Sequence, residues 1–66
     1  MRITLNGEAR EAEAGTTIAQ LIDTITSDRS RVAVERNRAI APRDTWDEAV
    51  VADGDEIEVV TLVGGG

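Results

Sequence analysis

The sequence contains no cysteine, no histidine and no lysine, and its only aromatic residue is Trp46. These absences exclude disulfides, thiolate chemistry, the usual zinc sites and Ser-His or Cys-His nucleophile pairs. Without lysine, no side-chain amine is present to form a Schiff base. A chain of 66 residues buries only about 60 % of the surface that its unfolded form exposes. We therefore expect a small aliphatic core, no metal site and no independent catalyst.

Basic residues are also scarce: the sequence has seven arginines and thirteen acidic residues, and its net charge is −6. Binding to nucleic acid requires a basic face that neutralises phosphates, so the balance argues against it and favours protein partners. No apolar run approaches the roughly 20 residues that span a bilayer. The start "MRITLNG" lacks the apolar segment of a signal peptide. We expect a cytoplasmic protein that does not bind membranes.

The first residues have the pattern of a hairpin. Ile3 and Leu5 alternate with polar residues, and Asn6-Gly7 is typical of a type I′ turn between antiparallel strands. The following stretch, residues 8–14, is weak strand sequence whose place depends on pairing with the first strand.

A helix is predicted within "GTTIAQLIDTITSD". Thr17 and Gln20 have the spacing of a capping box, and Asp23 and Thr24 are expected to face water. The apolar stripe of this helix consists of Ile18, Leu21, Ile22 and Ile25.

The rest of the chain reads as strands and turns. We expect a strand in "RVAVER" with Val32 and Val34 on one face, followed by a turn at Asn37-Arg38. An extended piece around Ile40 and a helical turn begun by Asp44 are expected next. An Asp53-Gly54 turn then leads into a final strand. This order predicts an α+β fold, a small mixed sheet covered on one face by a single main helix. The first and last strands are expected to be central, and residues 1–66 to form one domain.

The final strand is followed by three glycines, "VVTLVGGG". If Ile57 and Val59 point into the core, Val60 and Leu62 lie on the uncovered face. There they either pack against neighbouring side chains or form an exposed apolar patch, with Glu58 nearby, that serves as a docking surface beside the glycines.

Three other features favour structural interpretations. The segment "DGDE" lacks the number and spacing of ligands in a calcium loop and reads as a turn. The arginines between residues 29 and 43 have acidic neighbours at Asp28, Glu35 and Asp44, which favours a mixed-charge surface over an anion site. Trp46 is expected to close the edge of the core.

Taken in order, the segments "GTTIAQLI", "VAVERN", "IAPRDTW" and "DGDEIEVVTLVGGG" resemble the ThiS family, the sulfur carrier proteins of thiamine biosynthesis. The resemblance covers essentially the whole chain. It implies a ubiquitin-like β-grasp fold with a flexible tail at residues 64–66, and a free carrier that is monomeric.

The resemblance also implies a function for the tail. An E1-like adenylyltransferase (ThiF) would use ATP and magnesium to adenylate the carboxylate of Gly66, and a persulfide donor would convert it to a thiocarboxylate. Thiazole synthase (ThiG) would then take the sulfur. The carrier itself would bind no cofactor and would not be an enzyme.

The chemistry suits these residues. A free α-carboxyl has a pKa of about 3.3–3.7 and is a poor electrophile until AMP is installed as a leaving group. Gly64, Gly65 and Gly66 would extend about 10 Å at roughly 3.3–3.6 Å per residue, and without Cβ atoms they could enter a narrow channel. Ordering them costs about 1–2 kcal/mol per residue, so contacts made by Val60, Leu62 and Glu58 are expected to offset that cost.

Three alternatives remain open at this point. The chain could be the small subunit of molybdopterin synthase, which shares the fold and the tail chemistry. It could be a ubiquitin-like modifier whose glycine forms isopeptide bonds, or a plain interaction domain in which the tail has no function.

Overall fold

The computed structural model describes residues 1–62. The flexible tail predicted at Gly64, Gly65 and Gly66 lies outside these residues. The elements are β1 (Arg2–Leu5), β2 (Glu8–Glu11), α1 (Ile18–Asp23), the 3₁₀ helix η1 (Arg29–Arg31), β3 (Val32–Arg36), β4 (Ala39–Ile40), the 3₁₀ helix η2 (Arg43–Thr45) and β5 (Glu56–Thr61).

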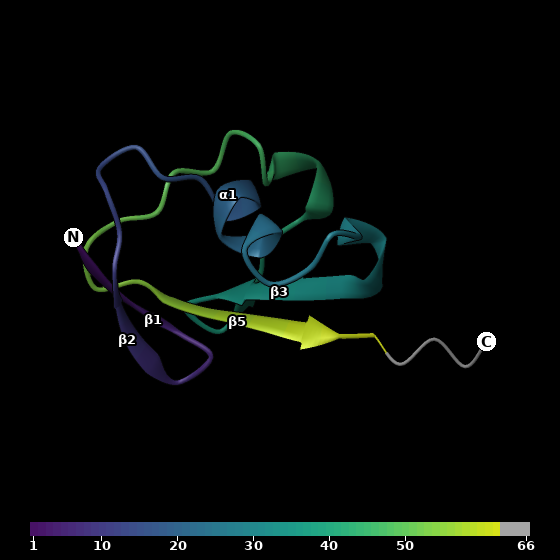
Figure 1. Cartoon of the computed structure of the whole chain (residues 1–66), viewed down its shortest axis with the longest axis horizontal. Helices are drawn as coiled ribbons and strands as arrows, with labels where there is room; N and C mark the ends of the chain where they lie inside the picture. Colours follow the sequence, from purple (N-terminus) through teal and green to yellow (C-terminus); the bar gives the residue numbers. More distant parts are fainter. Residues whose placement is uncertain (63–66) are drawn as a thin grey trace.

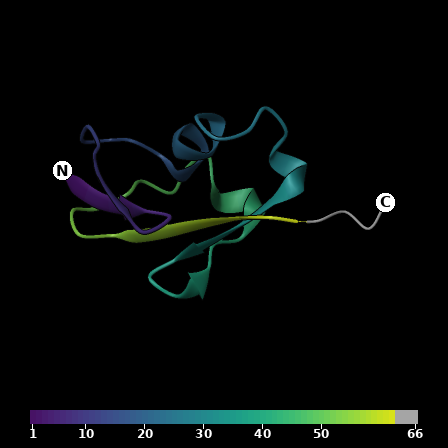
Figure 2. The same cartoon turned by 60° about the horizontal axis from the view of Figure 1, so that its bottom comes forward.

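Five strands form one mixed sheet in the order β2-β1-β5-β3-β4. β1 and β5 are parallel, and the other neighbours are antiparallel. In Figure 2 the β1–β2 hairpin, in purple, and the β3–β4 hairpin, in teal, lie on either side of β5. The prediction that the first and last strands are interior is confirmed: β5 is the middle strand and β1 is its neighbour.

The α+β prediction is also confirmed, because α1 covers one face of the sheet (Figure 1). The core between them consists of Ile3, Leu5, Ile18, Ala19, Ile22, Val32, Val34, Ala41, Trp46, Val51 and Ile57. Within residues 1–62, no helix is long and apolar enough to cross a membrane.

The two hairpin turns form as the sequence predicts. Asn6 and Gly7 have φ values of 50° and 81°, as a type I′ turn requires, and Asn37 and Arg38 have φ values of 52° and 69°. The weak second strand is β2, and the amide of Ala12 extends its pairing with a 2.8 Å hydrogen bond to the carbonyl of Met1.

The capping box of α1 is present in both directions. The Gln20 amide donates to the Thr17 hydroxyl over 3.2 Å, and the Thr17 amide donates to the Gln20 side chain over 2.9 Å. The predicted stripe is wrong at Ile25, because α1 ends at Asp23 and Ile25 is 42 % exposed. Thr24 ends the helix: its hydroxyl donates to the Leu21 carbonyl over 2.6 Å, a local bond of the kind that competes with helix continuation.

A second correction concerns the helical turn predicted to begin at Asp44. The 3₁₀ helix η2 begins one residue earlier, at Arg43, directly after Pro42. The φ of −59° at Pro42 prepares the chain for this turn, and the Pro42 carbonyl accepts from the Thr45 amide over 2.9 Å. Trp46 follows and is 2 % exposed, with its Nε1–H donating to the Ala41 carbonyl over 2.9 Å, so its predicted core position is confirmed.

Candidate functional site

The two faces of β5 differ as the alternation of its residues predicts. Ile57 is 1 % exposed and Val59 packs partly buried against the core. Val60 is 49 % exposed and Leu62 is 46 % exposed, on the face that α1 does not cover. The exposed position predicted for Val60 and Leu62 is therefore confirmed, and the exposed patch is favoured over packing within the chain.

The strand register brings residues of β3 and β4 to the same face. Ala33 pairs with Val60, Glu35 pairs with Glu58, and Ile40 pairs with Glu35. Residues directly opposite one another in antiparallel strands present their side chains on the same side. We name the resulting surface the outer patch; its members are Ala33, Glu35, Ile40, Glu56, Glu58, Val60 and Leu62.

Sequence reasoning found three of these residues, namely Val60, Leu62 and Glu58. The alternation of β3 already separated Ala33 and Glu35 from the buried Val32 and Val34. The missing information was the register, which determines which residue of β3 stands beside which residue of β5.

Beyond Val59, hydrogen bonds hold the end of β5 from the β3 side only, within residues 1–62. On the β1 side, the Asn6 amide donates to the Ile57 carbonyl over 2.9 Å, and the Asn6 side chain accepts from the Val59 amide over 2.8 Å. β1 ends there. On the other side, pairing with β3 continues, and the Leu62 amide donates to the Arg31 carbonyl over 2.6 Å. Pairing with β3 thus holds Val60 in the sheet, and the bond to Arg31 holds Leu62 directly after it.

The opposite end of β5 is anchored by Asp55, which is 7 % exposed. Its carboxylate accepts from the Arg36 guanidinium over 2.9 Å, the Asn37 amide over 3.0 Å and the Ala52 backbone N–H over 2.8 Å. Burial opposes ionisation of Asp55, but these donors together outweigh it and lower the pKa of the carboxyl. The sequence analysis read this segment as a turn, which Gly54 confirms with a φ of 86°, but it did not identify Asp55 as the anchor.

The arginines of the middle of the chain form the expected mixed-charge surface. Arg29 pairs with Asp23 at 2.9 Å and with Asp47 at 3.0 Å, and Arg31 pairs with Asp28 at 3.3 Å. Arg43 lies over the Trp46 ring, 4.9 Å from its centroid, and donates to the Val32 carbonyl over 3.0 Å. These three arginines are engaged within the chain, which favours a structural role for them over an anion site. Within residues 1–62, Arg38 is in no ion pair, but it lines a hollow together with Glu35, Glu56 and Glu58, which also suits a mixed-charge surface.

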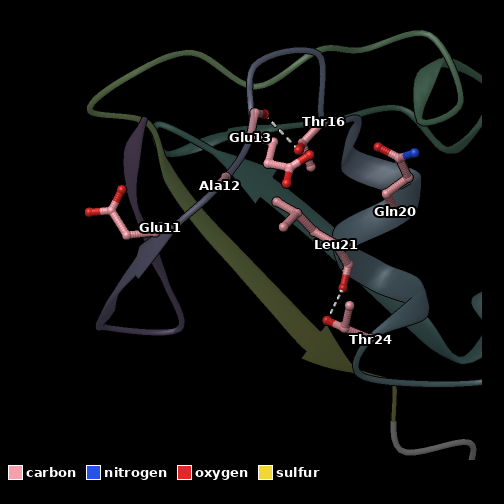
Figure 3. Close-up of a pocket in the computed structure, with 7 residues that line it drawn as sticks. All are labelled: Glu11, Ala12, Glu13, Thr16, Gln20, Leu21 and Thr24. Atoms are coloured by element: carbon pink, nitrogen blue, oxygen red, sulfur yellow. Dashed lines mark hydrogen bonds between the residues drawn. The ribbon is translucent and has the colours of Figure 1, made fainter.

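A hollow of about 380 Å³ lies on the helix side of the sheet (Figure 3). Leu21 of α1 points across it toward Ala12 and Glu13, whereas the side chain of Glu11 points away. The two threonine hydroxyls that line the hollow bond to nearby backbone: Thr16 donates to the Glu13 carbonyl and Thr24 donates to the Leu21 carbonyl. Because Val60 and Leu62 are on the other face, this hollow is separate from the outer patch.

Within residues 1–62, no cluster of three carboxylates could hold a metal ion. The outer patch consists of four apolar and three acidic residues and lies on β3, β4 and β5.

A mixed five-stranded sheet with one helix across it defines a ubiquitin-like β-grasp protein. The crystal structure of the thiamine biosynthesis protein ThiS from Geobacter metallireducens matches this fold with a TM-score of 0.80 and 29 % identity, over 100 % of both chains. The ThiS family model matches residues 3–66. The chain belongs to the ThiS family.

Two curated relatives are similar over the whole of this chain. The sulfur carrier protein ThiS of Escherichia coli is 32 % identical over 66 residues, which is 100 % of each chain. A thiazole synthase of Magnetococcus marinus is 47 % identical over 66 residues, but this chain spans only 20 % of that protein's length. A segment like this chain is therefore part of a longer polypeptide in Magnetococcus.

Proposed function

We propose that this chain is the sulfur carrier of thiazole formation in thiamine biosynthesis and that Gly66 carries the sulfur. The observation that supports this most directly is the end-to-end match to the sulfur carrier protein ThiS of E. coli. Membership of the ThiS family favours this function over the molybdopterin synthase subunit, the protein modifier and the plain interaction domain.

The reactive group of the proposed carrier is the main-chain carboxylate of Gly66. An E1-like enzyme of the ThiF type, using ATP and magnesium, joins this carboxylate to AMP and releases pyrophosphate. The terminal sulfur of a persulfide then attacks the acyl carbon and expels AMP. A thiol cleaves the sulfur–sulfur bond of the resulting acyl disulfide and leaves the thiocarboxylate on Gly66. Gly64 and Gly65 allow this group to enter a channel that a Cβ atom would obstruct.

We propose thiazole synthase of the ThiG type as the recipient of the sulfur. A chain named thiazole synthase contains a segment 47 % identical to this one, which supports a working association between the two proteins. The carrier supplies no acid, base or metal to either reaction. Its contribution is the docking of the outer patch, with Val60 and Leu62 as apolar contacts and Glu58 beside them, which offsets the entropy lost when the glycines are ordered.

The first test is the intact mass of the purified chain after incubation with the E1-like enzyme, ATP, magnesium and a persulfide source. Replacement of oxygen by sulfur adds about 16 Da because the carboxylate becomes a thiocarboxylate. A variant with one residue appended after Gly66 is the control, since it moves the carboxylate away from the family's terminal Gly-Gly. A gain of mass in the appended variant would contradict the assignment of Gly66.

Transfer to thiazole synthase is the second step of the same experiment. The thiocarboxylate form, supplied with thiazole synthase and its small-molecule substrates, is expected to return to the carboxylate mass as thiazole product accumulates. Formation of mass-shifted conjugates on other proteins would favour the modifier instead.

A further inference from the structure

Both hairpin turns of this protein begin with an asparagine that is bonded to β5. Asn6 begins the turn between β1 and β2 with a φ of 50°, and Asn37 begins the turn between β3 and β4 with a φ of 52°. The Asn6 amide donates to the Ile57 carbonyl over 2.9 Å, and its side-chain oxygen accepts from the Val59 amide over 2.8 Å. Asn37 makes the same two kinds of bond with Glu56, over 2.8 and 2.9 Å. The two asparagines therefore hold β5 from opposite sides.

On the β1 side, the Asn6 side chain takes the place of a main-chain acceptor. Hydrogen bonds between parallel strands are evenly spaced. The Thr4 amide donates to the Asp55 carbonyl and the Asn6 amide to the Ile57 carbonyl, so the next bond of the ladder would join the Val59 N–H to the Asn6 backbone carbonyl. The positive φ of Asn6 takes its backbone out of the strand conformation, and the Val59 N–H donates to the side-chain oxygen instead. One asparagine thus begins the turn and completes the ladder.

This bond is the last attachment of β5 on the β1 side, within residues 1–62. Val60 and the residues after it are held by β3 alone. Gly66 follows Val59 by seven positions in the sequence. Any freedom that the end of β5 keeps must be given up when an enzyme orders the chain around the reacting carboxylate. By pairing Val59, Asn6 reduces that freedom before the enzyme is met.

We propose that Asn6 is a positioning residue for the adenylation of Gly66. Its side-chain oxygen keeps β5 bonded on both sides as far as Val59, and so fixes the place from which the chain continues to the terminal carboxylate. Asparagine and aspartate suit this position because they tolerate a positive φ and carry a short side-chain acceptor. This inference rests on the proposed function and adds a residue, distant in sequence from Gly66, on which that function depends.

The test uses three full-length variants. Asn6→Gly allows the positive φ of the turn but removes the acceptor, whereas Asn6→Asp keeps both. Asn37→Gly is the matched control, because it makes the same change at the start of β5. Asn37 also donates to the Asp55 carboxylate over 3.0 Å, so the control should lose at least as much stability as Asn6→Gly. For each variant, pyrophosphate release by the E1-like enzyme gives the apparent KM and kcat for the carrier, amide hydrogen exchange reports on Val59, and a thermal melt gives Tm.

For Asn6→Gly we expect the Val59 amide to exchange about tenfold faster and the apparent KM to rise about three- to tenfold, because one hydrogen bond at the strand end is lost. The kcat should be unchanged, since Gly66 itself is intact. Asn6→Asp should return both the exchange rate and the KM close to their native values. Asn37→Gly should lower Tm at least as far as Asn6→Gly while leaving the KM unchanged.

The outcomes separate this inference from the proposed function. If the native chain is adenylated and Asn6→Gly keeps the native KM, Asn6 is not a positioning residue and the carrier function stands. If Asn37→Gly raises the KM as much as Asn6→Gly, a general loss of stability explains the effect and the inference is overturned. An Asn6→Asp variant with the raised KM of Asn6→Gly would show that the side-chain acceptor is not the cause. If the native chain is not adenylated at all, the proposed function fails, and the positioning role fails with it.

Discussion

Asp55 anchors the start of β5. It is an almost fully buried carboxylate that accepts hydrogen bonds from Arg36, Asn37 and the Ala52 backbone. One side chain thus joins the end of β3, the turn after it and the loop before β5. Removing its charge would leave Arg36 without its ion-pair partner, with only the Val50 carbonyl to accept from the guanidinium.

We predict that Asp55→Asn lowers the free energy of unfolding by about 1–3 kcal/mol at neutral pH, the usual cost of disrupting buried charge-assisted hydrogen bonds. Because the folded state lowers the pKa of Asp55, its contribution is complete above the unfolded pKa of about 3.9 and is lost as the pH falls through the folded pKa. The difference between variant and native chain should shrink toward pH 3. Urea unfolding at neutral pH and at pH 3 measures the difference in free energy of unfolding, with the exposed Asp44→Asn as control. The same difference at both pH values would contradict the role of ionised Asp55.

At the scale of elements, β5 serves two purposes with alternate residues. Ile57 and Val59 pack under α1, and Val60 and Leu62 stay exposed on the outer patch. Pairing with β3 holds both sets in place. Substitutions on the exposed set should therefore change docking without unfolding the protein.

We predict that Val60→Asp and Leu62→Asp each raise the apparent KM for adenylation by at least about tenfold, since a charge replaces an apolar contact of an interface. Melting curves should stay close to native because both side chains are about half exposed. Ile25→Asp is the matched control: Ile25 is 42 % exposed but lies outside the outer patch. Unchanged adenylation kinetics in the Val60 and Leu62 variants would remove these residues from the docking face.

Across the whole molecule, stability rests on one small core closed by Trp46. At roughly 0.05–0.15 kcal/mol per residue, the free energy of unfolding of a chain of 66 residues is about 3–10 kcal/mol. Trp46 is the largest fully buried side chain, and its carbonyl also accepts from the Ala19 amide of α1 over 3.0 Å. It connects η2, α1 and the segment after β4.

We predict that Trp46→Ala costs about 3–5 kcal/mol, which is enough to unfold much of the protein. Trp46→Phe keeps most of the volume but leaves the Ala41 carbonyl without its donor, so about 1–3 kcal/mol should be lost. Circular dichroism during thermal unfolding compares the two. A fully stable Trp46→Ala variant would show that the core does not depend on this side chain.

Much of this protein could be predicted from its sequence because local chemistry determines it. Asn6-Gly7 forms the hairpin turn, Thr17 and Gln20 cap α1, and alternation in β5 separates Ile57 from Val60. Each of these depends on residues within a few positions of one another. The resemblance to the ThiS family was equally a property of the sequence, and the family match confirmed it.

The error at Ile25 has a local cause, whereas the omissions came from contacts that are distant in the chain. Ile25 has the right spacing for the apolar stripe, but the helix ends before it because Thr24 bonds back to Leu21. Glu35 and Glu58 are 23 positions apart, and only the β3–β5 register places them opposite one another. Asp55 meets Arg36 for the same reason.

The sequence alone determined the hairpin turns, the side of β5 that is apolar and the place proposed for the reactive carboxylate. These follow from turn chemistry, from a period of two and from the glycines. The tertiary structure decided which strands are neighbours, and with that the composition of the outer patch and the opposition of two carboxylates on it. The physical reason is that strand pairing and register depend on burying the whole core under α1. The residues of that core come from distant parts of the chain, so no single segment determines the pairing.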